Sequence, residues 1–109
     1  MKLDFMQTNQ TINGKREGYW EEYWANGNLS YKGNWKNGKE DGYWEVYYSN
    51  GKLSSKRNYI NDKRDGYWEY YHSNGNLWSK GHYKNNNREG YWEEYYYNGG
   101  LKQSLFYAN

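Results

Sequence analysis

Aromatic and polar residues alternate along short segments of this chain. Residues 18–24 read Gly-Tyr-Trp-Glu-Glu-Tyr-Trp, and residues 29–36 read Leu-Ser-Tyr-Lys-Gly-Asn-Trp-Lys. Alternation with a period of two, in short runs rich in Tyr and Trp, is typical of β-strands. No segment carries apolar residues at the 3.6-residue period of an amphipathic helix. The pattern therefore predicts an all-β chain.

The same segment recurs at a fixed interval. Gly-Tyr-Trp begins at residues 18, 42, 66 and 90, a spacing of 24 residues without insertion. A fixed period of this length is the signature of a repeat architecture. The repeat domain over residues 13–109 divides into four units, residues 13–36, 37–60, 61–84 and 85–108. Residues 1–12 fall outside the pattern, and we expect an N-terminal capping segment there, because the ends of repeat arrays are atypical.

Asn-Gly dipeptides mark the expected turns. One lies near the middle of every unit, the first at Asn26-Gly27. Asn-Gly accepts positive φ at both positions and suits a two-residue type I′ hairpin turn. Such a turn predicts that Glu21 pairs with Lys32 and forms an ion pair with it. It also places Leu29 on the same face as Trp24. Residues 37–41 would then form a longer connection to the next unit.

These elements predict a single-layer antiparallel meander of tandem β-hairpins. Eight strands from the units and one from the cap would give a sheet roughly 40 Å long, at about 4.8 Å per strand. One face is the more apolar and holds Trp20, Tyr31 and Trp35, whereas the other holds tyrosine, glutamate and lysine. Aliphatic residues are too few for a second layer, so we expect stacked rings to stabilise the apolar face.

Composition narrows the classes of partner. The chain has 15 Lys and Arg against 13 Asp and Glu, and a net charge of +2. This balance predicts neither nucleic-acid binding nor attraction to an anionic membrane. Aromatic residues make up 23% of the chain, which opposes the disorder that a hydrophobic content of 35% would suggest. There is no Cys and no apolar secretory signal, so we expect a cytoplasmic location.

The units share the pattern Asn-Gly-Lys-x-x-Gly-x-Trp-x-x-Tyr-x-x-Asn-Gly-x-Leu-x-x-x-Gly-x-Tyr. It resembles the MORN repeat, and most closely the bacterial variant found in antitoxin-like proteins. The resemblance covers residue 13 to about residue 107, with Arg57 and Leu105 in place of the late glycine. It implies a β-hairpin scaffold that binds a protein partner or, in some relatives, associates with membranes. Choline- and cell-wall-binding repeats are a second resemblance, although their unit is usually shorter.

The candidate chemistry does not favour an enzyme, a cofactor or a metal. Glu21, Glu45, Glu69 and Glu93 form a column with a spacing of about 9.6 Å. That is close to the carboxylate separation of inverting glycosidases, roughly 6.5–9.5 Å. Three of the four face a lysine, however, so we interpret them as ion-pair partners on a solvated face. His72 and His82 are placed on opposite faces, which disfavours a shared metal site.

Partner specificity is expected at columns that differ between units, because the identical columns serve the fold. Tyr, Trp and Arg are also the residues that dominate interface hot spots. We predict a binding surface centred on the second and third units. Its residues are Trp24, Tyr48, Arg57, Tyr70, His72, Trp78 and Tyr96. The alternative is that these columns drifted neutrally among tolerated residues.

Three functions remain open. The first is a non-catalytic protein-binding module, such as an antitoxin or immunity protein that occludes a toxin, or another protein inhibitor. The second is a carbohydrate- or cell-surface-binding module that uses exposed Trp and Tyr. The third is a membrane-associated scaffold, or one that forms homo-oligomers through its open sheet edges.

Overall fold

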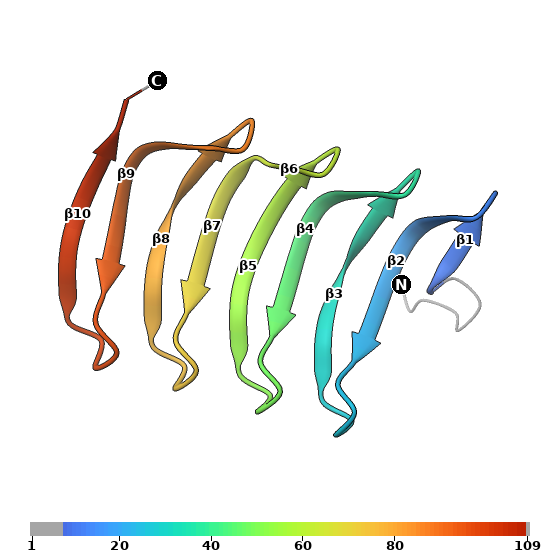
Figure 1. Ribbon diagram of the computed structural model, residues 1–109, viewed down its shortest axis with the longest axis horizontal. Helices are drawn as coiled ribbons and strands as arrows, with labels where there is room; N and C mark the ends of the chain where they lie inside the picture. The colour runs from blue at the N-terminus through green and yellow to red at the C-terminus, as the bar shows by residue number, and fades with distance from the viewer. Residues whose placement is uncertain (1–7, 109) are drawn as a thin grey trace, which may run out of the picture.

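The computed structural model describes residues 8–108, which form one open antiparallel sheet (Figure 1). The strands follow one another in chain order, except that β6 and β7 both pair with β5. They are β1 (Gln10–Ile12), β2 (Lys15–Tyr23), β3 (Leu29–Lys36), β4 (Lys39–Tyr47), β5 (Leu53–Ile60), β6 (Lys63–Arg64), β7 (Gly66–Tyr71), β8 (Leu77–Lys84), β9 (Asn87–Tyr95) and β10 (Leu101–Tyr107). The predicted all-β meander is confirmed. Between residues 8 and 108 there is no helix that could cross a membrane.

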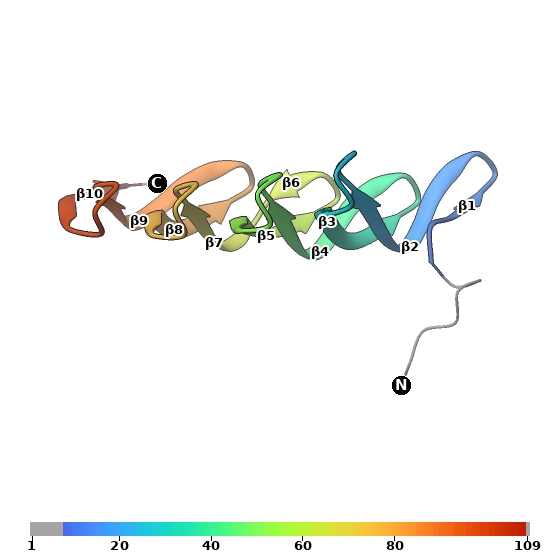
Figure 2. The same cartoon turned by 90° about the horizontal axis from the view of Figure 1, so that it is seen from below.

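The sheet is a single layer, as Figure 2 shows along its edge. Its extents of 45 × 35 × 25 Å agree with the length expected from stacked hairpins. Residues 1–7 of the predicted capping segment lie outside the described residues. From the rest of that segment, β1 pairs with β2. The Asn9 side chain donates to the Glu21 carbonyl oxygen at 2.9 Å and accepts from the Glu21 N–H at 2.8 Å. The described part of this segment therefore extends the sheet at its first edge.

The mid-unit turn differs from the prediction. Trp24 N–H donates to Asn28 O, and Gly27 N–H donates to Trp24 O, while only Gly27 in this loop has positive φ, at 91°. This is a three-residue loop in which a type I turn is followed by a left-handed glycine. The Asn26 side chain accepts from Asn28 N–H and donates to Ser49 O in the next unit. The predicted two-residue turn is wrong here, because Asn26 joins neighbouring turns instead of adopting positive φ.

The type I′ turn occurs instead between units. Asn37 and Gly38 have φ values of 53° and 81° and join Lys36 directly to Lys39. The connection predicted for residues 37–41 is therefore a tight hairpin turn, and residues 39–41 belong to β4. Both connections within the array are hairpins, but each has its own loop length.

The predicted register nevertheless holds along most of the first hairpin. Glu21 pairs with Lys32, as expected from the sequence. A bulge between Glu22 and Tyr23 offsets the extra loop residue, so that Tyr23 pairs with Leu29. Residues directly opposite each other lie on the same face. Leu29 therefore lies on the face of Tyr23, and its predicted place on the tryptophan face is wrong.

The core is a ladder of rings on one side of the sheet, called here the aromatic face. Its buried members are Trp44, Tyr59, Trp68, Tyr83 and Trp92. Successive rings meet edge to face, with centroids 4.9–6.0 Å apart. Such pairs contribute about 0.5–1.5 kcal/mol each beyond the apolar area that they bury. The expected packing of rings on the apolar face is confirmed, but the buried rings of the ladder meet edge to face instead of stacking.

Glycine lets a tryptophan lie across the neighbouring strand. A Cβ atom added at Gly33 would lie 2.1 Å from Trp44 Cδ2, and one at Gly81 would lie 2.3 Å from Trp92 Cδ2. Arg57 occupies the position equivalent to Gly33 and Gly81, next to Trp68. There the following strand is divided into β6 and β7, and the intervening Asp65 N–H donates to Asn58 O at 3.0 Å. The division of this strand thus coincides with the junction at which glycine is replaced.

We predict that Gly81→Ala lowers the free energy of unfolding by about 3 kcal/mol, because the new methyl group overlaps the buried Trp92 ring. Urea denaturation followed by circular dichroism measures the change. Gly100→Ala is the matched control, because its Cβ atom would meet only the Asn98 side chain, at 3.3 Å. An equal effect in the two variants would contradict the role of Gly81.

Candidate functional site

The aromatic face is capped by arginine side chains. The guanidinium carbon of Arg16 lies 4.2 Å from the centroid of the Trp20 ring, and that of Arg88 lies 4.2 Å from the Trp92 ring. Arg64 lies over Tyr83 at 4.5 Å, and Arg57 lies over Trp68 at 5.4 Å. A guanidinium over an aromatic ring is attracted by the negative face of that ring. The aromatic face therefore carries positively charged groups on top of a layer of aromatic rings.

The first half of this face carries opposing charges. A hollow of about 270 Å³ is lined by Arg16, Arg57, Glu22 and Glu40, among others. Arg16 Nη1 lies 3.0 Å from Glu22 Oε1. Burial and the charge of Asp62 raise the pKa of Glu40, and Arg57 partly opposes this shift. Positive and negative groups are thus balanced in the first two units.

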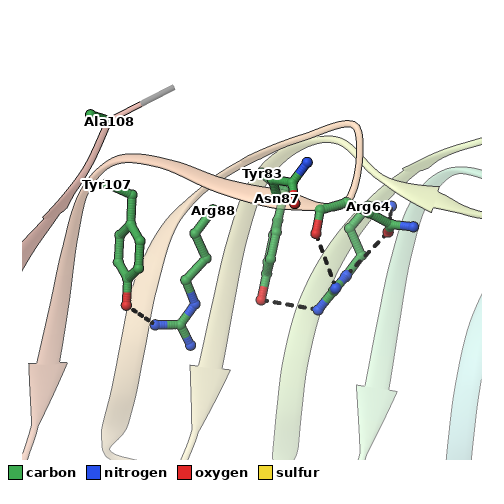
Figure 3. Close-up of a pocket in the computed structure, with 7 residues that line it drawn as sticks. Arg64, Tyr83, Asn87, Arg88, Tyr107 and Ala108 are labelled. Carbon is green, nitrogen blue, oxygen red and sulfur yellow. Dashed lines mark hydrogen bonds between the residues drawn. The ribbon is translucent and has the colours of Figure 1, made fainter.

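In the second half, one hollow is lined, within the described residues, by arginine without a carboxylate, although Arg88 also lines a smaller hollow together with Glu94. A hollow of about 740 Å³ is lined by Arg64, Tyr83, Asn86, Asn87, Arg88, Tyr107 and Ala108 (Figure 3). Its lining within residues 8–108 includes two arginines and no acidic side chain. Burial acts to lower the pKa of Arg88, but hydrogen bonds with Tyr107 and Tyr83 outweigh it, so that the pKa is raised. Arg88 is therefore firmly cationic.

Four of the seven sequence-predicted residues occupy one column of turns. Trp24 Nε1 donates to Tyr47 O at 3.1 Å, and Tyr48 Oη donates to Tyr71 O at 2.5 Å. His72 Nε2 lies 3.0 Å from Tyr95 O. Tyr96, the fourth member, is 52% exposed. The first three side chains thus link each turn to the next unit, which is a structural role that the sequence did not reveal.

The other three predicted residues lie nearer to the ring ladder. Tyr70 Oη is 3.1 Å from Tyr83 Oη, and Arg57 donates to Ser55 Oγ at 2.8 Å. Trp78 is 49% exposed and stacks on His72, with ring centroids 5.3 Å apart. Trp78 and Tyr70 together line a hollow of about 180 Å³. The structure therefore brings Tyr70, Trp78 and His72 together. Tyr96 lies in the neighbouring turn, which His72 contacts, and Trp24 lies two units away from His72.

Sequence reasoning missed the column of Arg16, Glu40, Arg64 and Arg88. Three of its members cap rings, and Glu40 stands where the fourth arginine would be. The criterion that selected the other columns, a difference between units, applies to this one as well. The difference between units at this position is therefore the sequence signal that identifies this column.

The opposite side, called here the tyrosine face, holds the glutamate column. Lysines pair with glutamates of the following unit: Lys32 with Glu45 at 3.2 Å, Lys56 with Glu69 at 3.6 Å and Lys80 with Glu93 at 3.6 Å. The predicted ion pair of Glu21 with Lys32 is wrong, although their backbones are paired. Lys32 lies between two glutamates and turns to Glu45, whose carboxylate is already held by Tyr43 and Tyr47.

Residues 8–108 contain no group of three or more His, Cys, Asp or Glu that could hold a metal ion. His82 packs against Tyr67, with ring centroids 5.3 Å apart, whereas His72 packs against Trp78 and Tyr97. The two histidines thus belong to different aromatic clusters.

A family model described as the MORN repeat variant matches residues 16–37, 40–61, 64–85 and 88–109. These four segments span most of the chain. The chain belongs to the MORN repeat variant family. A comparison with curated proteins gives no match.

MORN repeats form non-catalytic modules that commonly bind proteins or membranes. In this MORN protein each matched segment begins at a residue of the column whose arginines cap the rings. These residues are Arg16, Glu40, Arg64 and Arg88. These residues therefore belong to the repeat itself, at a position where the four copies are not identical.

We predict that Glu45→Gln destabilises this MORN protein at neutral pH and has less effect in acid. Burial acts to raise the pKa of Glu45, but hydrogen bonds from Tyr47, Tyr43 and Lys32 outweigh it and lower the pKa below 4.5. A lowered folded-state pKa adds stability that is present above the unfolded-state value and is lost as the pH falls through the folded-state value. Urea unfolding of both proteins at pH 7 and pH 3 measures the difference.

Glu69→Gln serves as a second instance, because hydrogen bonds from Tyr67 and Tyr71 likewise lower the pKa of Glu69 against the effect of burial. A stability difference that stays constant across the two pH values would contradict the assignment.

Proposed function

We propose that this MORN protein binds another protein and inhibits it by steric occlusion, as an antitoxin or immunity protein would. The family supports a non-catalytic binding module. The open aromatic face supplies the surface, because tryptophan, tyrosine and arginine on it are the residue types that dominate interface hot spots. A protein partner also suits a sheet of this size, since a single layer offers a broad surface rather than an enclosed cleft.

Trp78 is the observation that carries this proposal. It is a half-exposed tryptophan where the equivalent residues are Ser30, Ser54 and Lys102. Its ring is held by stacking on His72, and it borders the 180 Å³ hollow with Tyr70 and Arg88. The ring ladder does not require a tryptophan here, because the other units fold without one. A large, pre-positioned ring beside a hollow is typical of an interface anchor.

A second candidate is a carbohydrate-binding surface on the tyrosine face. Tyr91 and Phe106 are 73% and 62% exposed, and their ring centroids are 4.8 Å apart. Phe106 stands where the other units carry Asn34, Asn58 and His82. Exposed aromatic rings of this kind suit stacking against a sugar.

We predict that Trp78→Ser weakens partner binding about 30-fold, which corresponds to roughly 2 kcal/mol for a hot-spot residue. Affinity capture of the tagged protein from its native lysate, read by mass spectrometry, identifies the partner, and calorimetry with the purified pair measures the affinity. Serine is the residue of the first two units at this position, so the fold is expected to tolerate it.

Phe106→Asn is the matched control, since it also restores the residue of the first two units but lies on the tyrosine face. Unchanged affinity in Trp78→Ser would contradict a partner site on the aromatic face. Retention on glycan, abolished by Phe106→Asn, would favour the carbohydrate-binding function instead.

A further inference from the structure

Two arginines of successive units face the 740 Å³ hollow at the C-terminal end of the aromatic face. In Figure 3 the side chains lie in the order Tyr107, Arg88, Tyr83 and Arg64, with all four polar ends pointing the same way. The arginines occupy equivalent positions 24 residues apart. Two strand spacings of about 4.8 Å separate equivalent positions, so their backbones are roughly 9.6 Å apart.

Both guanidinium groups are held in place by the protein. Arg64 donates from Nε to Asn86 Oδ1 at 3.2 Å and from Nη2 to Asn86 O at 3.1 Å. Arg88 donates from Nη1 to Tyr107 Oη at 3.0 Å, and its guanidinium carbon lies 4.2 Å from the centroid of the Trp92 ring. Side chains that are fixed before binding lose less conformational entropy when a ligand arrives. The guanidinium fork also keeps further N–H donors for an anionic group.

The charge of this hollow differs from that of its counterpart in the first two units. There, Glu22 and Glu40 line the same hollow as Arg16 and Arg57. In the C-terminal hollow the lining within the described residues has no carboxylate to oppose Arg64 and Arg88. Glu94 and Arg88 both line the 180 Å³ hollow, but Glu94 does not line the 740 Å³ hollow, so a ligand can supply the negative charge there.

We propose that Arg64 and Arg88 bind two carboxylates of an acidic segment on the protein partner. Two separate, fixed cations suit two acidic side chains on one segment better than they suit a single phosphate group. In a segment with the polyproline II conformation, residues rise about 3.1 Å each with three residues per turn. Acidic residues three positions apart then lie on one side, about 9.3 Å apart, and match the arginine spacing. The amides of Asn86 and Asn87 and the hydroxyls of Tyr83 and Tyr107 can bond the backbone of that segment. This inference rests on the proposed function, because it names the chemistry of the partner.

The test is an NMR titration of the arginine Nε–H signals with a blocked hexapeptide that carries two glutamates three positions apart. We expect saturable shifts at Arg64 and Arg88, and no shifts with the peptide in which both glutamates are glutamine. Arg64→Gln and Arg88→Gln should each weaken binding about ten-fold or more, the loss expected for a hydrogen bond between charged groups. Arg88→Lys, which keeps the charge but loses the fork, should lie between Arg88→Gln and the unchanged protein.

Lys39→Gln is the charge-matched control, because it removes one positive charge from an exposed position at the start of β4. Circular dichroism verifies that each variant is folded. Equal binding of the glutamine peptide would overturn the proposal, and so would unchanged affinity in both arginine variants. An equal loss of peptide affinity in Lys39→Gln would show that only general charge attraction is at work, which overturns the proposal. If inorganic phosphate displaces the peptide and binds more tightly than it does, the hollow is a phosphate site instead.

The outcome is separable from that of the proposed function. A captured partner whose binding survives Arg64→Gln and Arg88→Gln would leave the inhibitor function standing and overturn the carboxylate site. Glutamate-dependent binding of the peptide, with no protein captured from the lysate, would support the site and count against the inhibitor function.

Discussion

Each buried tryptophan of the aromatic face lies across a strand of the preceding hairpin. The indole N–H groups of Trp44, Trp68 and Trp92 donate to backbone oxygens ten residues earlier, at 2.9–3.0 Å. One side chain thereby joins two units through a hydrogen bond, a buried apolar surface and edge-to-face packing against tyrosine. A single hairpin cannot bury its own rings, so each unit is stabilised by its contacts with the neighbouring unit. The close approach of glycine and the alternation of Trp and Tyr both follow from this contact.

A core built in this way leaves the sheet without a second layer. The rings bury one another along the array, and arginine side chains cover some of them. The arginine side chains cover the aromatic rings and keep N–H donors on this face, because a guanidinium can stack on a ring while its N–H groups stay available. The same arrangement that protects this face also makes it suitable for recognition.

The tyrosine face carries a network that recurs along the array, whereas the aromatic face carries residues that differ between units. On the tyrosine face, lysines and tyrosines hold glutamates in a regular network that crosses from unit to unit. On the aromatic face, the ring ladder is regular, but the residues above it change along the chain. Opposite charges line one hollow in the first two units. In the last two units Trp78, Arg88 and Glu94 line one hollow, whereas Arg64 and Arg88 line another whose described residues include no carboxylate. We therefore place the proposed partner site at the C-terminal end of the sheet.

The sequence by itself determined the repeat, the strands and most of the register, because the 24-residue period and the alternation of side chains are local properties. It also identified Trp78 and Tyr70 as unit-specific aromatics. The turn types were decided by tertiary structure, since the Asn26 side chain bonds the turn of the next unit and a bulge then restores the register. The same holds for Trp24, Tyr48 and His72, whose bonds to the following unit have no local signature. Only the stacked array shows that Arg64 and Arg88 share one hollow, because their proximity depends on which way neighbouring strands turn their side chains.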